Sequence, residues 1–278
     1  MQLWCTEEQT EYLGLTTRIK ETLFRGKSAF QDIAIVDSYQ FGRMLVLDGI
    51  FQTSIAEEFV YHEMIAHVPL FIHPNPQSVL VIGGGDGGTV REVVRHSRVK
   101  SVEMVEIDGM VVDVAKQYLP EISVAIKKKN PKLKVTIGDG IAYVKTVKNM
   151  YDVIIVDCSD PIGPGCGLFT HEFYKNVYQA LKPDGLFVQQ TESPFYHQSL
   201  IKRISYDVAA IFPLQAMYLA HIPLYPGGMH CFTMGSKKYG PLDADIKRES
   251  NLPMRYYNES IQQACFALPN FLKNIIKS

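Results

Sequence analysis

The sequence predicts an α/β fold, in which a doubly wound, mostly parallel sheet follows a small antiparallel β domain. Three observations support this prediction. An apolar run at 79–82 leads into a glycine-rich turn at 83–88 and then into helical spacing of apolar residues. Strand-like and helix-like segments alternate from there on, which is typical of a parallel sheet with helices on both faces. The residues before 55 instead resemble consecutive strands joined by turns.

The N-terminal segment contains two clear strand patterns, at 31–37 and 43–48. The dipeptide Asp48-Gly49 ends the second pattern and is a strong hairpin signal. We therefore expect a β domain over 1–54 and the α/β domain over 55–278.

The α/β domain should open with a helix at 56–68, with Ser54 as its N-cap. Pro69 and the Pro74-Asn75-Pro76 cluster should end it. Apolar and β-branched runs predict the later strands, and apolar residues three or four apart predict the helices. A break is expected at Pro269. The expected strands are 101–108, 133–137, 153–157, 186–190, 218–221 and 231–234, and the expected helices are 89–96, 110–119, 171–181, 198–210 and 254–276.

The glycine-rich turn matches the dinucleotide fingerprint G-x-G-x-x-G at Gly83, Gly85 and Gly88. This pattern alone also fits a structural turn without a ligand. A second signal favours a ligand, because Glu106 ends the next strand at about the 20-residue offset from which a carboxylate binds ribose hydroxyls. Together the two signals predict a nucleoside site.

Asp86 lies inside the glycine-rich turn, where a dinucleotide would place its pyrophosphate. Two like charges about 4 Å apart repel by on the order of 4 kcal/mol at an effective dielectric constant near 20. The turn therefore favours a cationic nucleoside without phosphate, such as an adenosyl sulfonium. The alternative is that Asp86 is a solvated turn residue.

Several further polar residues follow predicted strands. Ligands of such sheets bind outside the carboxyl ends of the strands. Asp139, beside Gly140, follows one strand, and Gln190 and Glu192 follow another. A single aspartate here is often only the N-cap of the next helix, and for Asp139 a contact to the adenine amino group competes with that role.

Asp157 and Asp160 form a pair in a loop whose prolines, Pro161 and Pro164, restrict the backbone. Together with Asp86, and with Glu192 if it faces the same cleft, they would repel one another in an empty site, and one or more would take up a proton. A polycationic ligand would relieve this repulsion. A sulfonium donor with an ammonium acceptor fits such a wall.

Composition excludes several other classes. The net charge of −1 offers no electrostatic footprint for nucleic acid, and no apolar run approaches the ~18 residues that span a membrane. The N-terminus is acidic and lacks the apolar region of a signal peptide. The cysteines are odd in number and widely spaced, which predicts reduced thiols in the cytoplasm and no zinc site: Cys5, Cys158, Cys166, Cys231 and Cys265.

As a set, the motifs resemble the spermidine synthases, which are polyamine aminopropyltransferases. The resemblance covers nearly the whole chain and implies a Rossmann-like catalytic domain of the methyltransferase type. It also implies a homodimer or homotetramer, assembled through the N-terminal strands. The motifs that carry it are Leu47-Asp48-Gly49, Tyr61-His62-Glu63-Met64, Gly83 to Gly88, Asp157 to Pro164, Ile222-Pro223-Leu224-Tyr225-Pro226 and Tyr256-Tyr257-Asn258.

The resemblance implies transfer of the aminopropyl group of decarboxylated S-adenosylmethionine to putrescine, giving spermidine and 5′-methylthioadenosine. Asp157 is the implied proton acceptor, and no metal or redox cofactor is implied because the donor is a co-substrate. The residues implied to bind the donor are Gln31, Gly83, Gly85, Asp86, Glu106, Asp139, Gly140 and Pro164. The residues implied to bind the amine are Tyr61, His62, Asp86, Asp157, Asp160, Gln190 and Tyr225.

Three other functions share parts of this pattern. A class I S-adenosylmethionine-dependent methyltransferase has the same sheet, but Asp86 should repel the carboxylate of its donor. A nicotinamide oxidoreductase is disfavoured by the same carboxylate. A nucleoside-binding module without catalysis would not need Asp157. The acceptor amine stays open among putrescine, cadaverine, agmatine and spermidine.

Overall fold

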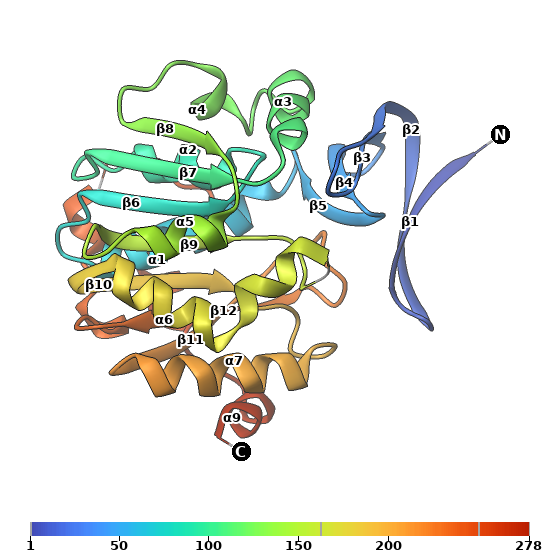
Figure 1. The fold of residues 1–278 in the computed structure, drawn as a ribbon. Coiled ribbons are helices and arrows are strands. Elements are labelled where there is room, and N and C mark those ends of the chain that lie inside the picture. Colours follow the sequence, from blue (N-terminus) through green and yellow to red (C-terminus); the bar gives the residue numbers. More distant parts are fainter. Residues whose placement is uncertain (1, 162, 250, 278) are drawn as a thin grey trace.

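The computed structural model describes residues 2–161, 163–249 and 251–277 (Figure 1), and two β-sheets organise them. In the first sheet the strands follow chain order and all neighbours are antiparallel. The predicted N-terminal β structure is confirmed, whereas the domain boundary after residue 54 stays a prediction. The strands are β1 (Leu3–Thr10), β2 (Leu13–Lys27), β3 (Asp32–Ser38), β4 (Gly42–Leu47) and β5 (Ile50–Ser54).

The hairpin between β4 and β5 forms at the predicted dipeptide. Asp48 and Gly49 have φ values of 49° and 86°, and Leu47 pairs with Ile50. Two positive φ values are what a two-residue type I′ turn requires. The Asp48 carboxylate also accepts a hydrogen bond of 2.8 Å from the backbone N–H of Asp32. This contact ties the hairpin to β3.

The second sheet has the order β11-β12-β10-β9-β6-β7-β8. The strands from β10 to β8 are parallel, and β12 runs antiparallel to both of its neighbours. The strand order reverses between β6 and β9, which is where such sheets open a crevice for a ligand. The strands are β6 (Ser78–Gly83), β7 (Ser101–Glu106), β8 (Leu133–Ile137), β9 (Tyr151–Asp157), β10 (Leu181–Gln190), β11 (Leu214–His221) and β12 (Met229–Ser236).

The central strand β6 separates two apolar cores. Val79 and Val81 join one core, and Leu80 and Ile82 join the other, because successive strand residues face opposite sides. All four are at most 2% exposed. This two-sided burial explains why β6 is a continuous apolar run.

Helices cover both faces of this sheet. Figure 1 shows α5, α6 and α7 in front of it and α1 and α2 behind it. The helices are α1 (Glu58–Ile72), α2 (Gly88–Val94), α3 (Gly109–Tyr118), α4 (Val124–Lys127), α5 (Gly140–Thr146), α6 (His171–Ala180), α7 (Gln198–Ile211), α8 (Glu259–Ala264) and α9 (Asn270–Lys277), with 3-10 turns η1 (Gly163–Phe169), η2 (Pro241–Asp243) and η3 (Ile246–Glu249).

The boundaries of α1 correct two predictions. Ser54 does not cap the helix, because its hydroxyl donates to the side chain of Glu57. Pro69 does not end it either, and the helix continues to Ile72. A proline inside a helix costs about 3 kcal/mol or more. The last turn, Leu70 to Ile72, is fully buried in the core, and this burial offsets that cost.

Other boundaries differ by smaller amounts. The strand expected at 101–108 ends at Glu106, because Asp108 caps α3 by accepting from the backbone N–H of Met110 at 3.0 Å. The short helices α4 and α5 were not predicted. The tail begins as a helix only at Glu259, and the predicted break at Pro269 separates α8 from α9.

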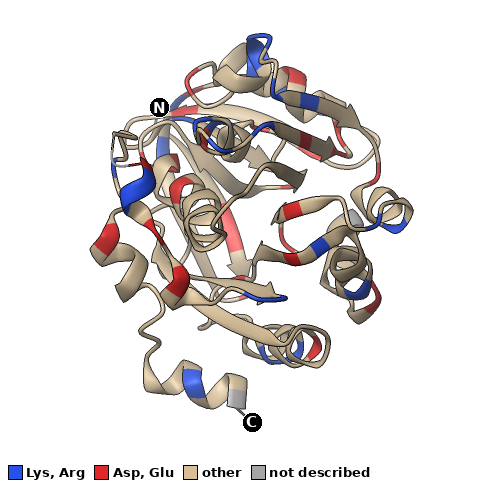
Figure 2. Cartoon of the chain, turned by 90° about the vertical axis from the view of Figure 1, so that its left-hand side faces the viewer, with Lys and Arg blue, Asp and Glu red and all other residues tan. Residues whose placement is uncertain are grey.

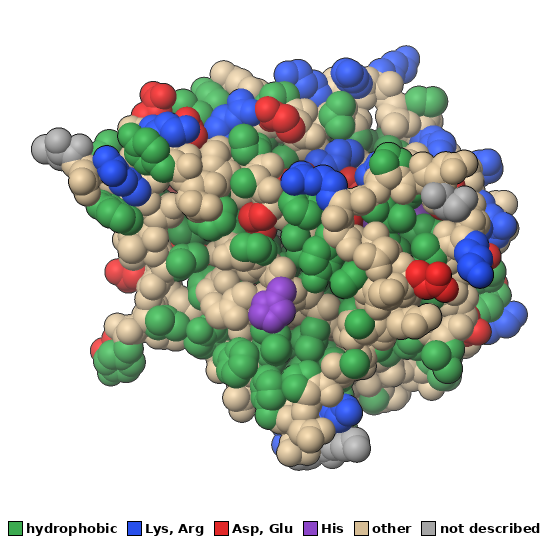
Figure 3. Space-filling model, turned by 180° about the vertical axis from the view of Figure 1, so that it is seen from behind, with side chains coloured by type: hydrophobic (Ala, Val, Ile, Leu, Met, Phe, Trp, Pro, Cys, Tyr) green, Lys and Arg blue, Asp and Glu red, His purple; other side chains and the backbone are tan. Residues whose placement is uncertain are grey.

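The surface carries charges of both signs. Acidic and basic residues are interspersed over the elements seen in Figure 2. On the face shown in Figure 3, basic side chains lie along the upper edge, and apolar side chains gather around one exposed histidine. Among the described residues, none of the helices has the length and apolar character needed to cross a membrane.

Candidate active site

A cavity of about 270 Å³ opens at the carboxyl ends of β6, β7 and β9, between the two sheets. The first sheet and its loops contribute residues that include Gln31, Asp48 and Gln52. The rest of the wall comes from the second sheet, from α1, α3 and α5, and from the segments that follow β9 and β11. The structure thus brings together most residues predicted from the sequence. Those lining the cavity are Gln31, Tyr61, His62, Gly83, Gly85, Asp86, Glu106, Asp139, Gly140, Asp157, Asp160 and Tyr225.

Two predicted residues stand apart from this cavity. Gln190 lines a smaller neighbouring cavity of about 40 Å³, together with Glu7, Asp160 and Glu192. The side chain of Pro164 lies outside the described part of the structure, although its backbone belongs to η1.

The glycines of the turn make room for two acidic residues, Asp157 and Glu106. Gly83 and Gly84 have φ values of 83° and 72°, and a Cβ on Gly83 would lie 2.0 Å from the carbonyl oxygen of Asp157. A Cβ on Gly85 would lie 3.1 Å from a carboxylate oxygen of Glu106. The turn therefore packs directly against the acids of β7 and β9, which only glycine permits.

Glu106 forms the floor of the larger cavity, beside the glycine-rich turn. Its side chain is buried, and one oxygen accepts from the backbone N–H of Asp108 at 2.9 Å. Burial raises the pKa of Glu106 to about 7. The amide of Gln31 donates to Asp108 at 2.9 Å, so a loop of the first sheet is fixed to this floor. Asp108, which we did not predict as a site residue, holds both predicted residues in place.

Asp139 caps α5, which is one of the two roles that the sequence left open for it. One carboxylate oxygen accepts from the backbone N–H groups of Ile141 and Ala142, at 2.7 and 3.2 Å. The residue also lines the cavity, so capping and a ligand contact are compatible.

Asp86 lies in a charged, largely buried setting, so its interpretation as a solvated turn residue is wrong. Its side chain is 13% exposed, and one oxygen lies 3.4 Å from Nε2 of His62. The other oxygen accepts from the backbone N–H of Gly88 at 2.7 Å. Although burial alone would raise it, the charge of His62 holds the pKa of Asp86 below its usual range.

Asp157 lines the larger cavity, next to Tyr61 and Cys158, which line both cavities, and both of its carboxylate oxygens are held. The hydroxyl of Tyr61 donates to one and the hydroxyl of Thr89 donates to the other, each at 2.7 Å. Burial, and then the nearby charge of Asp86, raise the pKa of Asp157. A fixed carboxylate with a raised pKa is suited to accept a proton from a bound amine.

The smaller cavity is acidic. Burial, and then the charge of Asp160, raise the pKa of Glu192 far above its usual value. Burial also raises the pKa of Asp160, and it raises that of Glu7 to about 7. Such proton uptake by clustered carboxylates was expected from the sequence. Glu7 was not among the expected residues, because it comes from β1 in the other sheet.

Comparisons with known proteins agree with this geometry. Residues 58–246 match the spermine/spermidine synthase domain, and residues 3–54 match the spermidine synthase tetramerisation domain. The polyamine aminopropyltransferase of Caldicellulosiruptor bescii is 54% identical over 277 residues, covering 100% of this chain and 99% of that protein. The chain belongs to the spermine/spermidine synthase family.

Solved structures of this family have the same fold. The spermidine synthase of Thermotoga maritima is 42% identical, with a TM-score of 0.94 over 99% of this chain and 94% of that one. A spermidine synthase in complex with the transition-state analogue AdoDATO is 42% identical, with a TM-score of 0.96 over 99% of this chain and 95% of that one. The predicted fold class is thus confirmed.

Gln190 has a structural role in this family member that the sequence did not suggest. Its amide nitrogen donates to the carbonyl of Cys158 at 3.0 Å, and its oxygen accepts from Nε2 of His230 at 2.9 Å. Burial lowers the pKa of His230 to about 3, so this histidine is neutral. The pair holds the loop after Asp157, and the predicted amine contact of Gln190 stays a prediction.

Among the functional residues that we did not predict, one had a readable signal. Glu58 stands four residues before His62, the spacing at which helical side chains meet. Thr89 directly follows the glycine fingerprint but carries no separate signal. Glu7 had none, because only the packing of the two sheets places β1 near the site.

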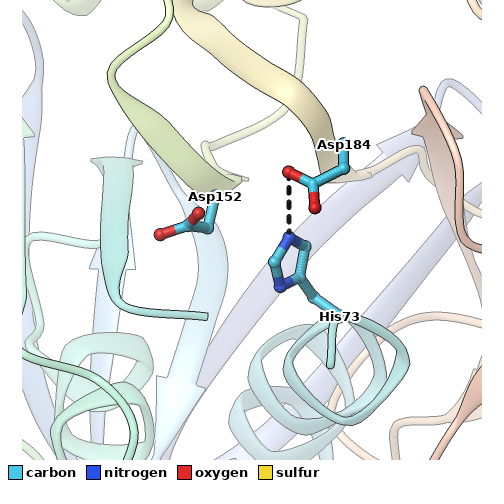
Figure 4. Close-up of side chains that lie close together, drawn as sticks. All are labelled: His73, Asp152 and Asp184. Carbon is cyan, nitrogen blue, oxygen red and sulfur yellow. Dashed lines mark ion pairs between the residues drawn. The ribbon is translucent and has the colours of Figure 1, made fainter. Parts of the chain in front are cut away.

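A cluster of His73, Asp152 and Asp184 lies at the opposite end of the sheet from Asp157 (Figure 4) and has the residue types of a metal site. Nδ1 of His73 accepts from the backbone N–H of Asn75, so the neutral ring carries its proton on Nε2, which faces Asp184 at 3.9 Å. One oxygen of Asp152 already accepts from Lys182 at 2.9 Å. The protonated nitrogen and the nearby ammonium are unsuited to ligation, so we assign this cluster a structural role.

Proposed function

We propose that the chain transfers the aminopropyl group of decarboxylated S-adenosylmethionine to putrescine, giving spermidine and 5′-methylthioadenosine. One observation carries this proposal: the carboxylate of Asp157, held at both oxygens, lines the larger cavity beside Tyr61 and Cys158, which also line the smaller, acidic cavity. The names of the relatives and of the solved structures support it.

The nucleoside would occupy the larger cavity. Glu106 would accept hydrogen bonds from the ribose hydroxyls, and Gln31 and Asp139 would contact the nucleoside from opposite sides. The ionised carboxylate of Asp86 would bind the ammonium at the end of the aminopropyl group. The same charge would repel the carboxylate of S-adenosylmethionine, which argues against a methyltransferase.

The acceptor would enter the acidic cavity, where Glu7, Asp160 and Glu192 compensate its charge. Its reacting ammonium would first give a proton to Asp157, since a protonated amine has no electron pair for attack. The nitrogen then attacks the methylene carbon next to sulfur. A C–N bond forms, the C–S bond breaks, and its electron pair stays on the sulfur of neutral 5′-methylthioadenosine. The new secondary amine of spermidine keeps a positive charge.

Assembly and location belong to the same proposal. We propose a homodimer or homotetramer built through the first sheet, which is supported by the match of residues 3–54 to a tetramerisation domain. A cytoplasmic location is proposed from the cysteine pattern of the sequence alone.

The test is a product assay by mass spectrometry. The enzyme is incubated with decarboxylated S-adenosylmethionine and, separately, with putrescine, cadaverine, agmatine or spermidine. Parallel reactions contain S-adenosylmethionine instead. We expect equimolar spermidine and 5′-methylthioadenosine with putrescine, and no product in the parallel set. Methyl transfer from S-adenosylmethionine, or no turnover with any of the amines, would contradict the proposal.

A further inference from the structure

His62 is held between two carboxylates. Its side chain is 1% exposed, Nδ1 lies 2.6 Å from Oε2 of Glu58, and Nε2 lies 3.4 Å from Oδ2 of Asp86. An ionised carboxylate only accepts hydrogen bonds, and an imidazole ring donates from both nitrogens only when it is protonated. The geometry therefore favours the imidazolium form of His62.

Glu58 is in turn held by Arg91. Two nitrogens of the guanidinium bind the two carboxylate oxygens, at 3.0 and 2.7 Å, and the third binds Glu92 at 2.8 Å. Such a two-pronged contact fixes orientation as well as charge. Arg91, Glu58, His62 and Asp86 thus form a chain in which positive and negative charges alternate. Its members come from α1, α2 and the glycine-rich turn.

The glycine at the end of the fingerprint fixes this chain in space. A Cβ on Gly88 would lie 2.2 Å from Cε1 of His62, so the ring packs against a bare backbone. The backbone N–H of Gly88 also donates to Asp86 at 2.7 Å. Gly88 therefore holds the ring and the carboxylate in one arrangement.

We propose that Glu58 and Arg91 are positioning residues of this site, which keep His62 doubly protonated and thereby keep Asp86 anionic for the cationic donor. This inference rests on the proposed function. Neither residue lines the larger cavity itself, and both act through His62, which does. The other titratable groups that face the chain include Glu57 just before α1, Tyr61 on α1, Glu92 on α2, Glu106 on β7, Asp157 on β9 and Tyr225 between β11 and β12.

Loss of the Glu58 charge should change the ionisation of the site. Without it, His62 keeps one acidic partner and gives up a proton more readily. Asp86 and Asp157 would then share a buried site without a counter-charge, and a carboxylate would take up a proton. The donor ammonium would lose its partner at low pH but regain it at high pH, where Asp86 ionises again.

The first test compares pH profiles of kcat/KM for the donor. In Glu58→Gln we expect the acid limb to move up by about one pH unit or more, which is a tenfold loss at a pH on that limb. Activity should recover at alkaline pH, and kcat there should stay near the parent value. Glu58→Asp keeps the charge farther from Nδ1 and should shift the limb less.

Glu172→Gln is the matched control. Glu172 also lies in the first turn of a helix, α6, and pairs with Lys145 at 3.0 Å on the surface. Its pH profile should equal that of the parent. Melting temperatures establish that each variant is folded.

The second test needs no turnover, so it separates this inference from the proposed function. Nitrogen-15 NMR of labelled histidine reports the charge of each ring, and the His62 signal is the one missing in His62→Gln. We expect His62 to stay an imidazolium beyond pH 8 in the parent and to titrate lower in Glu58→Gln. Should Glu58→Gln not fold, Glu58→Asp must still lower that titration. A neutral His62 in the parent at pH 7, or unchanged titration in the folded variants, would overturn the inference.

Discussion

The two cavities of the cleft balance charge in different ways. We call the larger cavity, which we propose binds the donor, the donor half, and the smaller cavity the acceptor half. In the donor half, Asp86 has a cationic partner inside the protein, because two carboxylates raise the pKa of His62 far above its usual value despite its burial. In the acceptor half, the described residues that line the cavity include no lysine or arginine. Burial lowers the pKa of the two nearby histidines, His197 and His230.

Under the proposed function, this difference indicates how each substrate would be recognised. In the donor half, Asp86 has its counter-charge before a ligand binds, because His62 lies beside it. In the acceptor half, burial raises the pKa of Asp160, Glu192 and Glu7, which favours their protonated forms. A polycationic acceptor can replace those protons. In this proposal the acceptor half needs the positive charge of its substrate to offset the carboxylates, whereas Asp86 in the donor half already has His62 as its counter-charge.

The largest effect is expected at Asp157, next to the residues that line both halves. Asp157→Asn keeps the shape of the side chain but removes the proton acceptor, so kcat should fall by about 10²–10⁴-fold. Part of the loss should return as pH rises, because more of the amine is then already deprotonated. Steady-state kinetics from pH 6 to 10 measure both effects.

Asp113→Asn provides the control for this substitution, since the Asp113 side chain is 81% exposed on α3. It should leave kcat unchanged. The Asp157 assignment is wrong if Asp157→Asn turns over near the parent rate while Asp160→Asn is inactive. In that case Asp160 is the proton acceptor.

A smaller effect is expected at Glu106, which tests the donor half. Hydrogen bonds to a charged group contribute about 1.5–3 kcal/mol, so Glu106→Gln should weaken 5′-methylthioadenosine binding by about 10–100-fold. Because the pKa of Glu106 is raised to about 7, binding to the parent should weaken as pH falls below 7. The variant should lose this pH dependence. Calorimetric titrations at pH 5.5 to 8.5 compare the two, and equal pH dependence would remove Glu106 from the ribose site.

The strand-end acids could be predicted because a parallel sheet gathers the carboxyl ends of its strands at one edge. Glu106, Asp139 and Asp157 were found in this way. Glu7 could not be found, because β1 belongs to another sheet and its contact with Phe51 on β5 depends on tertiary packing. For the same reason the sequence did not predict that α1 continues past Pro69 to Ile72. That continuation depends on burial of the last turn in the core, which no local sequence pattern indicates.

A further effect, expected at Glu7, tests the acceptor half. Glu7→Gln keeps an oxygen that can accept from the backbone N–H of Phe51, which the parent does at 2.8 Å, but it removes a charge. We expect the KM for putrescine to rise by about three- to tenfold, which corresponds to a typical net hydrogen-bond contribution of about 0.5–1.5 kcal/mol. The KM for the donor should not change. Equal increases for both substrates would mean that Glu7 shapes the fold rather than the acceptor cavity.

The smallest effect concerns stability without substrate. The pKa of Glu7 is raised to about 7 in the folded protein, above its ordinary value of 4.5 in the unfolded chain. The folded state therefore keeps this proton longer, and the associated stability is lost as pH rises from about 4.5 to 7. One such group contributes at most about 1.4 kcal/mol per pH unit. The melting temperature of Glu7→Gln should fall less than that of the parent between pH 5 and 8, and parallel curves would contradict this.

The most direct test of the contrast between the halves is the number of protons released when putrescine binds. Calorimetry of the 5′-methylthioadenosine complex at pH 7, in buffers of different ionisation enthalpy, measures this number. Putrescine should release protons from the acceptor half, and Glu192→Gln should release about one fewer than the parent. If putrescine binds without proton release, or if Glu192→Gln releases as many protons as the parent, the acceptor half does not hold protons in place of its substrate.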